Sequence, residues 1–223
     1  HNIASNVDAV IELLRLTAID RLMGVLPFFH AFGFTDTLWL PLSSEPSAVY
    51  HFNPLDARTV GSLIEKHNCT ILIATPTFLR SYLKRCTVAE MKSMNLVIVG
   101  AEKLPEDLRL AFREKFGFEP TEGYGTTEMS PVASFNVPES RMADDAKLEV
   151  GTKHGTVGRV IPGCSAAVFD RETGEMLGED QEGLLKIKGP NIMLGYLNQP
   201  EKTAEMIQDG WYNSGDMAII DED

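Results

Sequence analysis

The chain has 223 residues, of which 43% are hydrophobic and 23% are charged, a composition typical of a globular protein with a sizeable core. Its formal net charge of −12 argues against a nucleic-acid partner, because binding to a phosphate backbone requires a basic surface. The three cysteines are far apart and form no Cys-x-x-Cys pair, so the sequence predicts neither a disulfide framework nor a zinc site and favours a reducing cytosol.

The first part of the chain alternates short apolar runs with amphipathic segments. Helical spacing of apolar residues predicts a helix over residues 4–16, and the apolar run 21–26 predicts a strand that ends before Pro27. Residues 22–42 are apolar enough and long enough to span a bilayer. The prolines, His30 and Asp36 within this stretch favour a buried strand, loop and helix instead.

Further strands are expected over residues 48–52, 70–74 and 95–99. The helices after them have recognisable ends: Asp56 and Thr75 as N-caps, Pro76 as a first helical residue, and Gly117 as a terminator. Repeated strand–helix pairs predict an α/β fold in which helices flank a largely parallel sheet.

The pattern changes after residue 137. Residues 138–155 are polar and show no periodicity, which predicts a loop. Short strands over 157–160, 166–169, 183–187 and 217–220, a turn over 170–174 and one helix over 200–207 predict a smaller β-rich subdomain. We therefore expect an α/β subdomain over 1–137, a loop over 138–155 and a β-rich subdomain over 156–223.

Residues 121–128 read Thr-Glu-Gly-Tyr-Gly-Thr-Thr-Glu, which is a candidate ligand-binding segment. The two glycines allow the backbone to approach a ligand on both sides of Tyr124, whose ring could stack on a base. The two threonine hydroxyls could donate to a phosphate, and Glu128 could bind a hard cation. The alternatives are a glycine-rich turn with a buried tyrosine, and a dinucleotide fingerprint that lacks its third glycine.

Four more motifs occur along the chain. They are Gly-Ala-Glu-Lys-Leu (100–104), Gly-Thr-Val-Gly-Arg (155–159), Lys-Gly-Pro-Asn-Ile-Met-Leu-Gly-Tyr (188–196) and Gly-Trp-Tyr-Asn-Ser-Gly-Asp (210–216). In this order, together with residues 121–128, they resemble the superfamily of adenylate-forming enzymes. That superfamily contains acyl-CoA and aryl-CoA ligases, peptide-synthetase adenylation domains and luciferases. The resemblance covers nearly the whole chain.

Within the superfamily, four segments are similar to the fatty acyl branch: residues 26–33, 100–104, 134–138 and 188–196. They are especially similar to acyl-acyl carrier protein synthetases fused to a 2-acylglycerophosphoethanolamine acyltransferase. Long-chain acyl-CoA synthetases share much of this similarity. The resemblance implies an ATP-dependent ligase that converts a fatty acid to an acyl-adenylate. The acyl group then passes to a thiol, either of coenzyme A or of the phosphopantetheine of an acyl carrier protein. It also implies ATP/AMP and Mg²⁺ as ligands, a membrane-associated acyltransferase domain in the parent protein, and a location in the cytoplasm or at the inner face of the membrane.

The resemblance implies roles for individual residues. Tyr124 would stack against adenine, and Asp216 would accept hydrogen bonds from the ribose hydroxyls. Catalytic roles fall to Thr127 at the α-phosphate, to Glu128 as the Mg²⁺ ligand, and to His30 at the carboxylate end of the acyl channel. The other nucleotide-binding residues would be Gly100, Ala101, Glu102, Gly123, Gly125 and Thr126.

Some readings remain open from the sequence. His30 could instead be a histidine packed behind its aromatic neighbours, and Tyr196 and Trp211 are expected as packing residues. The family's phosphate loop and C-terminal domain with its catalytic lysine are expected outside these residues, so the chain by itself is expected to be inactive. Alternatives are a non-catalytic nucleotide- or acyl-binding module on the same scaffold, and a pyridine-nucleotide oxidoreductase, which the missing third glycine disfavours.

Overall fold

The structure, a computed structural model, describes residues 1–142 and 150–223, so part of the expected loop over 138–155 lies outside the described residues. The elements of the first, larger part are α1 (Asn2–Leu14), β1 (Arg21–Gly24), α2 (Ala31–Gly33), the π-helix η1 (Phe34–Trp39), α3 (Leu40–Ser43), β2 (Ser47–Tyr50), α4 (Ala57–His67), β3 (Ile71–Ala74), α5 (Pro76–Arg85), β4 (Leu96–Val99), α6 (Glu106–Phe116), β5 (Thr121–Gly125), the 3-10 helix η2 (Thr127–Met129), β6 (Val132–Phe135), the 3-10 helix η3 (Glu139–Arg141) and β7 (Arg159–Val160). The smaller part contains β8 (Ser165–Phe169), β9 (Glu182–Lys188), α7 (Pro200–Met206), β10 (Ile207–Gln208) and β11 (Trp211–Ile219).

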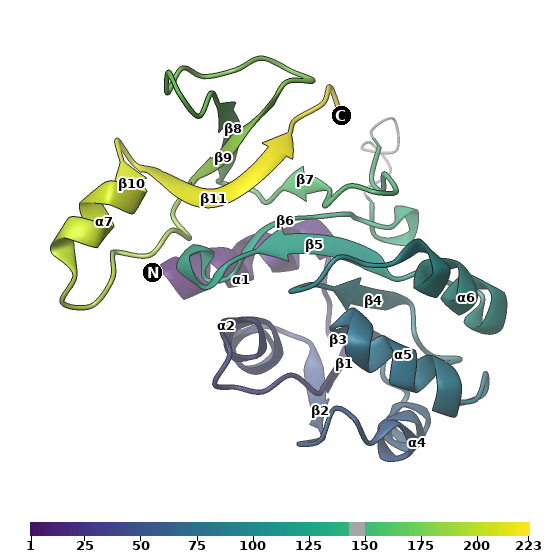
Figure 1. The fold of residues 1–223 in the computed structure, drawn as a ribbon. Coiled ribbons are helices and arrows are strands. Elements are labelled where there is room, and N and C mark those ends of the chain that lie inside the picture. Colours follow the sequence, from purple (N-terminus) through teal and green to yellow (C-terminus); the bar gives the residue numbers. More distant parts are fainter. Residues whose placement is uncertain (143–149) are drawn as a thin grey trace.

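The strands form two sheets, which lie one above the other in Figure 1. The first has seven strands in the order β2-β1-β3-β4-β5-β6-β7, and the second has four in the order β10-β11-β9-β8. Strands β2, β1, β3, β4 and β5 pair in parallel, whereas β6 and β7 pair antiparallel. The second sheet is antiparallel. The expected α/β fold with a largely parallel sheet and a smaller β-rich part is therefore confirmed.

Alternate residues of the central strands contribute to two hydrophobic cores. Because successive side chains of a strand point to opposite faces, each strand supplies both cores. Helices α4, α5 and α6 cover one face and pack on Leu72, Ala74, Val97 and Val99. Helix α1 covers the other face and packs on Ile71, Ile73, Leu96 and Ile98.

Several helix ends lie where the sequence predicts them. Asp56 caps α4 by accepting a hydrogen bond from the Thr59 N–H at 3.2 Å, and Thr75 caps α5 by accepting one from the Phe78 N–H at 3.4 Å. Gly117 ends α6 with a φ of 83°, a conformation in which glycine is preferred. Asp56 and Thr75 thus fix the loops at the carboxyl ends of β2 and β3, the edge at which open α/β sheets bind ligands.

Several strands differ from the sequence-based expectation. The expected strand over 157–160 was assigned to the β-rich part, but β7 pairs with β6 and belongs to the first sheet. Strands β5, β6 and β10 were not predicted as strands. The subdomain limits remain a proposal, and the pairing of β7 favours placing the second limit at residues 161–164 rather than at 156.

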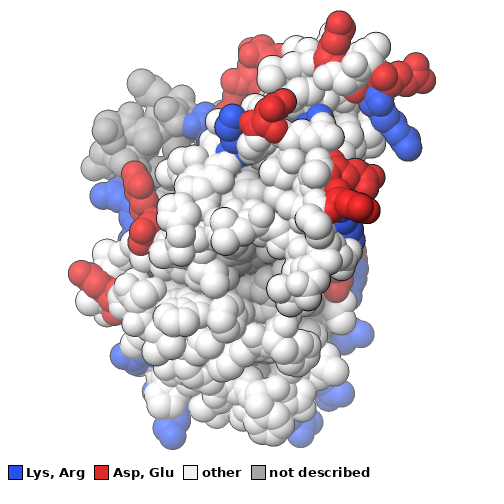
Figure 2. Space-filling view, turned by 90° about the vertical axis from the view of Figure 1, so that its left-hand side faces the viewer, with Lys and Arg blue, Asp and Glu red and all other residues white. Residues whose placement is uncertain are grey.

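Residues 22–42 form the end of β1, a loop and the helices α2, η1 and α3, as expected. Among the described residues, no helix is both long enough and apolar enough to cross a membrane. The side of the molecule on which α2 and α7 lie carries few charged residues around a central hollow (Figure 2). The segment from β1 to α3 contributes several exposed large apolar side chains: Phe28, Phe29, Phe34, Trp39 and Leu42.

Candidate active site

Tyr124 and Asp216 meet between the two sheets. Tyr124 lies on β5 of the first sheet and Asp216 on β11 of the second. The Tyr124 hydroxyl donates a hydrogen bond of 2.5 Å to Asp216 Oδ2. Burial, followed by this hydrogen bond, raises the pKa of Tyr124, so the hydroxyl keeps its proton at neutral pH. Both side chains line the same cavity, while their roles toward a nucleotide remain predictions.

Two cavities share the backbone of residues 123–126 as a common wall. One, which we call the polar cavity, measures about 410 Å³ and is lined mainly by Ala101, Glu102, Lys103, Glu122, Gly123, Tyr124, Gly125, Thr126, Thr156 and Asp216. The other, the apolar cavity, measures about 60 Å³ and is lined mainly by His30, Phe32, Ile98, Val99, Gly100, Thr127, Pro131, Val132 and Phe135. The structure thus brings every predicted site residue except Glu128 to one of these cavities, and Glu128 directly follows Thr127.

At two glycines in the cavity walls, neighbouring atoms lie so close that a side chain would collide with them. A Cβ atom at Gly125 would lie 1.9 Å from the carbonyl oxygen of Pro131, a backbone atom that cannot move aside. At Gly100 a Cβ atom would lie 2.9 Å from the Phe32 ring. The absence of side chains at these positions therefore allows the turn after β5 to close and the Phe32 ring to lie against the end of β4.

Ala101 turns the chain at the carboxyl end of β4. Its φ of 67° lies in the left-handed region, which costs a residue with a Cβ atom about 1–2 kcal/mol. This conformation places Ala101 and Glu102 in the wall of the polar cavity, where the Glu102 carboxylate accepts a 3.0 Å hydrogen bond from the Thr77 hydroxyl. Backbone strain at the rim of a cavity is typical of a functional site.

Glu128 lies on η2, directly after the cavity wall. Its Oε1 accepts a hydrogen bond of 2.8 Å from the Tyr196 hydroxyl. Burial raises the pKa of Glu128, but hydrogen bonds from its own backbone N–H and from Tyr196 outweigh burial, so the pKa lies below its usual value. The carboxylate is therefore ionised at neutral pH.

The residues near Glu128 suit a magnesium ion that is bound together with a nucleotide. Mg²⁺ is usually held by one or two carboxylates together with phosphate oxygens and water. No group of three or more His, Cys, Asp or Glu side chains that could hold a metal occurs in residues 1–142 or 150–223. Glu128 is the ionised carboxylate that directly follows the cavity wall. Thr126 Oγ1, in the wall of both cavities, is buried and has no hydrogen-bond partner among the described residues. An orphaned oxygen of this kind is satisfied when a ligand donates to it or binds it.

His30 is exposed and caps α2, where its Nδ1 accepts a hydrogen bond of 3.2 Å from the Phe32 N–H. An accepting Nδ1 places the proton of the neutral ring on Nε2. The side chain also lines the apolar cavity. His30 is thus positioned both as a helix cap and as a wall of the cavity.

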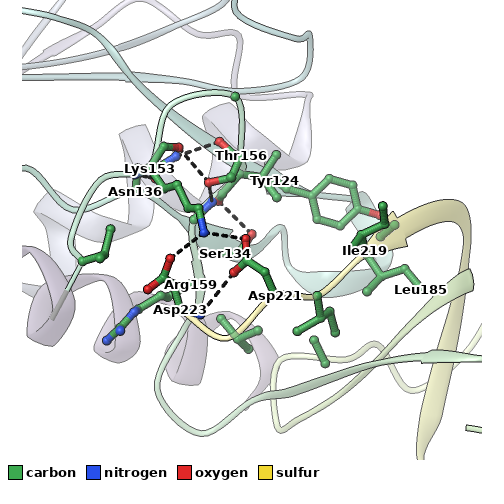
Figure 3. Close-up of a pocket in the computed structure, with 18 of the residues that line it drawn as sticks. Tyr124, Ser134, Asn136, Lys153, Thr156, Arg159, Leu185, Ile219, Asp221 and Asp223 are labelled. Atoms are coloured by element: carbon green, nitrogen blue, oxygen red, sulfur yellow. Dashed lines mark hydrogen bonds and ion pairs between the residues drawn. The ribbon is translucent and has the colours of Figure 1, made fainter. Parts of the chain in front are cut away.

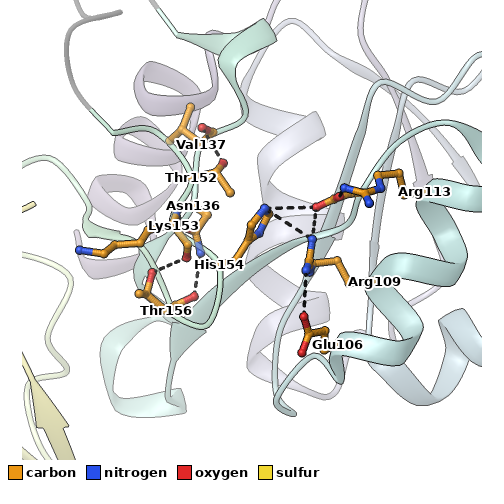
Figure 4. Close-up of polar contacts among 10 residues, drawn as sticks. Glu106, Arg109, Arg113, Asn136, Val137, Thr152, Lys153, His154 and Thr156 are labelled. Atoms are coloured by element: carbon orange, nitrogen blue, oxygen red, sulfur yellow. Dashed lines mark hydrogen bonds and ion pairs between the residues drawn. The ribbon is translucent and has the colours of Figure 1, made fainter.

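Polar contacts hold the loop over 152–156 in place, as Figure 4 shows. Asn136 Nδ2 donates to the Thr156 carbonyl at 2.8 Å, and Asn136 Oδ1 accepts from the Lys153 N–H at 2.9 Å. On α6, Arg109 forms a 2.6 Å ion pair with Glu119, whose carboxylate also lies 3.5 Å from His154 Nε2. These contacts place Thr156 in the wall of the polar cavity.

A third cavity of about 690 Å³ lies between the two sheets (Figure 3). Tyr124 lines it as well, together with Leu185 of β9 and Ile219 of β11. Lys153 forms ion pairs with Asp221 at 2.8 Å and Asp223 at 2.5 Å, which join the loop over 152–156 to the residues after β11. Tyr124 therefore lines both the third cavity and the polar cavity.

The sequence did not identify Tyr196 as a site residue. It was expected to pack, yet its hydroxyl reaches Glu128 from 68 positions away. Trp211, expected to pack, lies edge-on to Phe169 with ring centroids 5.7 Å apart. The position of Tyr196 at the end of the motif over 188–196 was the one sequence feature that could have marked it as a site residue.

Comparisons with known proteins agree on one family. The sequence profile of the family described as "AMP-binding enzyme" matches residues 1–197. The chain is 31% identical over 208 residues to a long-chain-fatty-acid–CoA ligase of Bacillus subtilis, covering 92% of this chain and 35% of that protein. It is 32% identical over 226 residues to a 4-coumarate–CoA ligase of Pinus taeda, covering 100% and 41%.

Solved structures show the same relationship. The crystal structure of apo MatB from Rhodopseudomonas palustris superposes with a TM-score of 0.87 at 31% identity and covers 99% of this chain and 42% of that one. O-succinylbenzoate coenzyme A synthetase (MenE) from Bacillus subtilis, in complex with ATP and magnesium ion, gives 0.83 at 25% identity, covering 99% and 43%. The chain thus spans less than half the length of each of these relatives.

Proposed function

Because the chain belongs to the family of AMP-binding enzymes, we propose that it forms the nucleotide-binding part of an ATP-dependent acid–thiol ligase. In the proposed reaction a carboxylate oxygen attacks the α-phosphorus of ATP, and pyrophosphate leaves. A thiol then attacks the acyl carbonyl carbon of the acyl-adenylate, and AMP leaves. The curated relatives cited above are named as CoA ligases, which supports this reaction class.

The contact between Tyr124 and Asp216 carries the proposal. An aromatic ring and a carboxylate from two different sheets line one polar cavity and touch at 2.5 Å. The ring would stack on adenine, and the carboxylate would accept hydrogen bonds from the ribose hydroxyls. Gly123 and Gly125 keep the backbone beside the ring free of side chains, and Ala101 and Glu102 also line the cavity.

Thr127 and Glu128 would act on the phosphates. The first step brings two anions together, so fixed donors and positive charge must offset the repulsion in the transition state. The Thr127 hydroxyl would donate to the α-phosphate, and the ionised Glu128 carboxylate would hold Mg²⁺. When bound, Mg²⁺ neutralises charge on the phosphate oxygens.

The apolar cavity, which measures about 60 Å³, would take the part of a fatty acyl group next to the carboxylate. Its walls are largely hydrocarbon, from Phe32, Ile98, Val99, Val132 and Phe135, and such walls favour an apolar group. His30, at the same cavity, would lie near the carboxylate and could donate from Nε2. An aryl-propenoic acid is the second candidate, because several relatives are named 4-coumarate–CoA ligases. The acceptor thiol would belong to coenzyme A or to the phosphopantetheine of an acyl carrier protein.

Calorimetric titration of the purified chain with AMP and with MgATP tests the nucleotide site. We expect Asp216→Asn to weaken AMP binding by about 1–3 kcal/mol, the cost of losing charge-assisted hydrogen bonds. Tyr50→Phe is a matched control, because it removes a 2.8 Å hydrogen bond to the Thr37 carbonyl elsewhere in the molecule. If the unmodified chain binds neither nucleotide, the proposal is wrong.

Acid and acceptor are tested on the longest natural form of the protein. Fatty acids and cinnamic acids are compared in ATP–pyrophosphate exchange, and coenzyme A is compared with holo-acyl carrier protein in thioester formation. Nucleotide binding without exchange for any acid would favour a non-catalytic binding module. A cytoplasmic location, an association with the inner face of the membrane and a fused acyltransferase domain remain proposals that rest on the resemblance.

A further inference from the structure

Residues 190–196 lie in the connection between β9 and α7 and form hydrogen bonds to η2, the 3-10 helix that contains Glu128. The buried side chain of Asn191 donates from Nδ2 to the carbonyls of Met129 at 2.9 Å and Val132 at 3.0 Å. From the opposite side, Asn6 of α1 donates to the same Val132 carbonyl at 2.7 Å. Two buried asparagines from distant parts of the chain therefore fix the backbone directly after Glu128.

The same segment contacts Glu128 itself at two points. The Met193 N–H donates to the Glu128 backbone carbonyl at 2.8 Å. The Tyr196 hydroxyl donates to Glu128 Oε1, also at 2.8 Å. The contact from Met193 positions the backbone of Glu128, and the contact from Tyr196 orients its carboxylate.

Tyr196 is in turn held by α7. Its backbone N–H donates to Thr203 Oγ1 at 2.9 Å, and Lys202 Nζ lies 4.3 Å from the centroid of its ring. A hydroxyl held in this way can fix the carboxylate to which it donates. Hydrogen bonds to a charged acceptor are also roughly twice as strong as neutral ones.

We propose that Tyr196 is a positioning residue that orients the Glu128 carboxylate toward a Mg²⁺ ion bound with the nucleotide. Oε1 of the carboxylate accepts the tyrosine hydroxyl, and Oε2 would face the metal. This inference rests on the proposed function, since it requires Glu128 to be the metal ligand. It gives the motif over residues 188–196 a role in the site rather than in packing alone.

The experiment compares ATP binding in excess Mg²⁺ with AMP binding in EDTA, for the unmodified chain and for Tyr196→Phe. We expect Tyr196→Phe to lower the MgATP affinity about 10-fold, as is typical when the partner that orients a metal ligand is removed. AMP affinity without metal should stay the same, because the ring and its packing are kept. Tyr50→Phe, which also removes one 2.8 Å tyrosine hydrogen bond, should change neither affinity.

A double-mutant cycle shows whether Tyr196 acts through Glu128. In a Glu128→Ala background, Tyr196→Phe should cause no further loss of MgATP affinity. An equal loss of AMP and MgATP affinity in Tyr196→Phe, or no loss of either, would overturn the proposal. If the unmodified chain binds neither nucleotide, the proposed function itself fails, which is a distinct result.

Discussion

The hydroxyl of Tyr124 donates to the carboxylate of Asp216, its partner 92 positions away on the other sheet. Each side chain therefore already contacts the other at the place where we propose that a nucleotide binds. A ribose hydroxyl that donates to Asp216 would compete with the tyrosine hydroxyl for the same oxygen. The ring and the hydroxyl of Tyr124 should thus have opposite effects on AMP binding.

This relationship predicts a difference between two substitutions of Tyr124. Tyr124→Ala removes the stacking surface and should weaken AMP binding by about 1–3 kcal/mol. Tyr124→Phe keeps the ring and removes the competing donor, so AMP should bind at least as tightly as to the unmodified chain. Calorimetry on both variants checks this. A loss in Tyr124→Phe as large as that in Tyr124→Ala would show that the hydroxyl, and not the ring, contacts the nucleotide.

Glu128→Gln should impair Mg²⁺-dependent adenylation while leaving the fold intact. The amide is a poor metal ligand of nearly the same size, so transition-state stabilisation should fall by roughly 2–4 kcal/mol. ATP–pyrophosphate exchange by the longest natural form of the protein is the measurement, and the melting temperature reports on the fold. Glu205→Gln, at an exposed position of α7, is the control. Near-normal exchange in Glu128→Gln would exclude Glu128 as the metal ligand.

Phe32→Ala should change which acids are accepted. The Phe32 ring lines the apolar cavity and lies against Gly100, so its removal lengthens the space available to the acyl group. Each additional methylene that becomes buried contributes about 0.8 kcal/mol, or about fourfold in kcat/KM. We expect the preferred acid to become longer or bulkier in exchange assays over a chain-length series. An unchanged preference would show that the acyl group lies elsewhere.

The strand–helix order of the first part was predictable because the signal is local. Buried strands over 71–74 and 96–99 are continuous apolar runs, and each is followed by a recognisable helix start. Strand β6 was missed because it has only four residues, which include Ala133 and Ser134 and therefore form no continuous apolar run. Periodicity also does not identify pairing partners, which is why β7 was assigned to the wrong sheet.

The candidate site was predictable only in part. Tyr124 and Asp216 each belong to a motif, so the resemblance pointed to both. The contact from Tyr196 to Glu128 depends on how the β9–α7 connection folds back over η2, which no local pattern encodes. The same holds for Asn6, whose helical position predicts burial but not its hydrogen bond to Val132.

Arg141→Met should destabilise the fold strongly at neutral pH. The Asp20 carboxylate is 2% exposed and receives hydrogen bonds from Arg141, Thr70 and Thr17. Burial raises the pKa of Asp20, but the hydrogen bonds, that from Arg141 first, outweigh it and hold the pKa below 3.8. Removing the arginine leaves a buried charge without its ionic partner, which should lower the free energy of unfolding by about 3–5 kcal/mol.

The pH dependence of this effect follows from the lowered pKa. The stabilisation is fully present above the unfolded-state pKa and is lost as the pH falls through the folded-state pKa. The difference between the unmodified chain and Arg141→Met in urea unfolding should therefore be constant from about pH 5 to 7 and shrink below about pH 4. Arg80→Met, which breaks an exposed pair with Asp107, should cost at most about 1 kcal/mol. Equal losses in both variants would contradict the argument.

The 223-residue chain by itself should bind AMP without turning over ATP. Lys103 is the only lysine or arginine among the described residues that line the polar and apolar cavities. These residues therefore offer little positive charge to stabilise the departing pyrophosphate or to align it with the attacking carboxylate. Without that support, adenylation should be slower by many orders of magnitude. Release of labelled pyrophosphate, measured beside Glu128→Gln, is the test. Turnover by the unmodified chain at an ordinary enzymatic rate, absent in the variant, would show that these residues hold a complete active site.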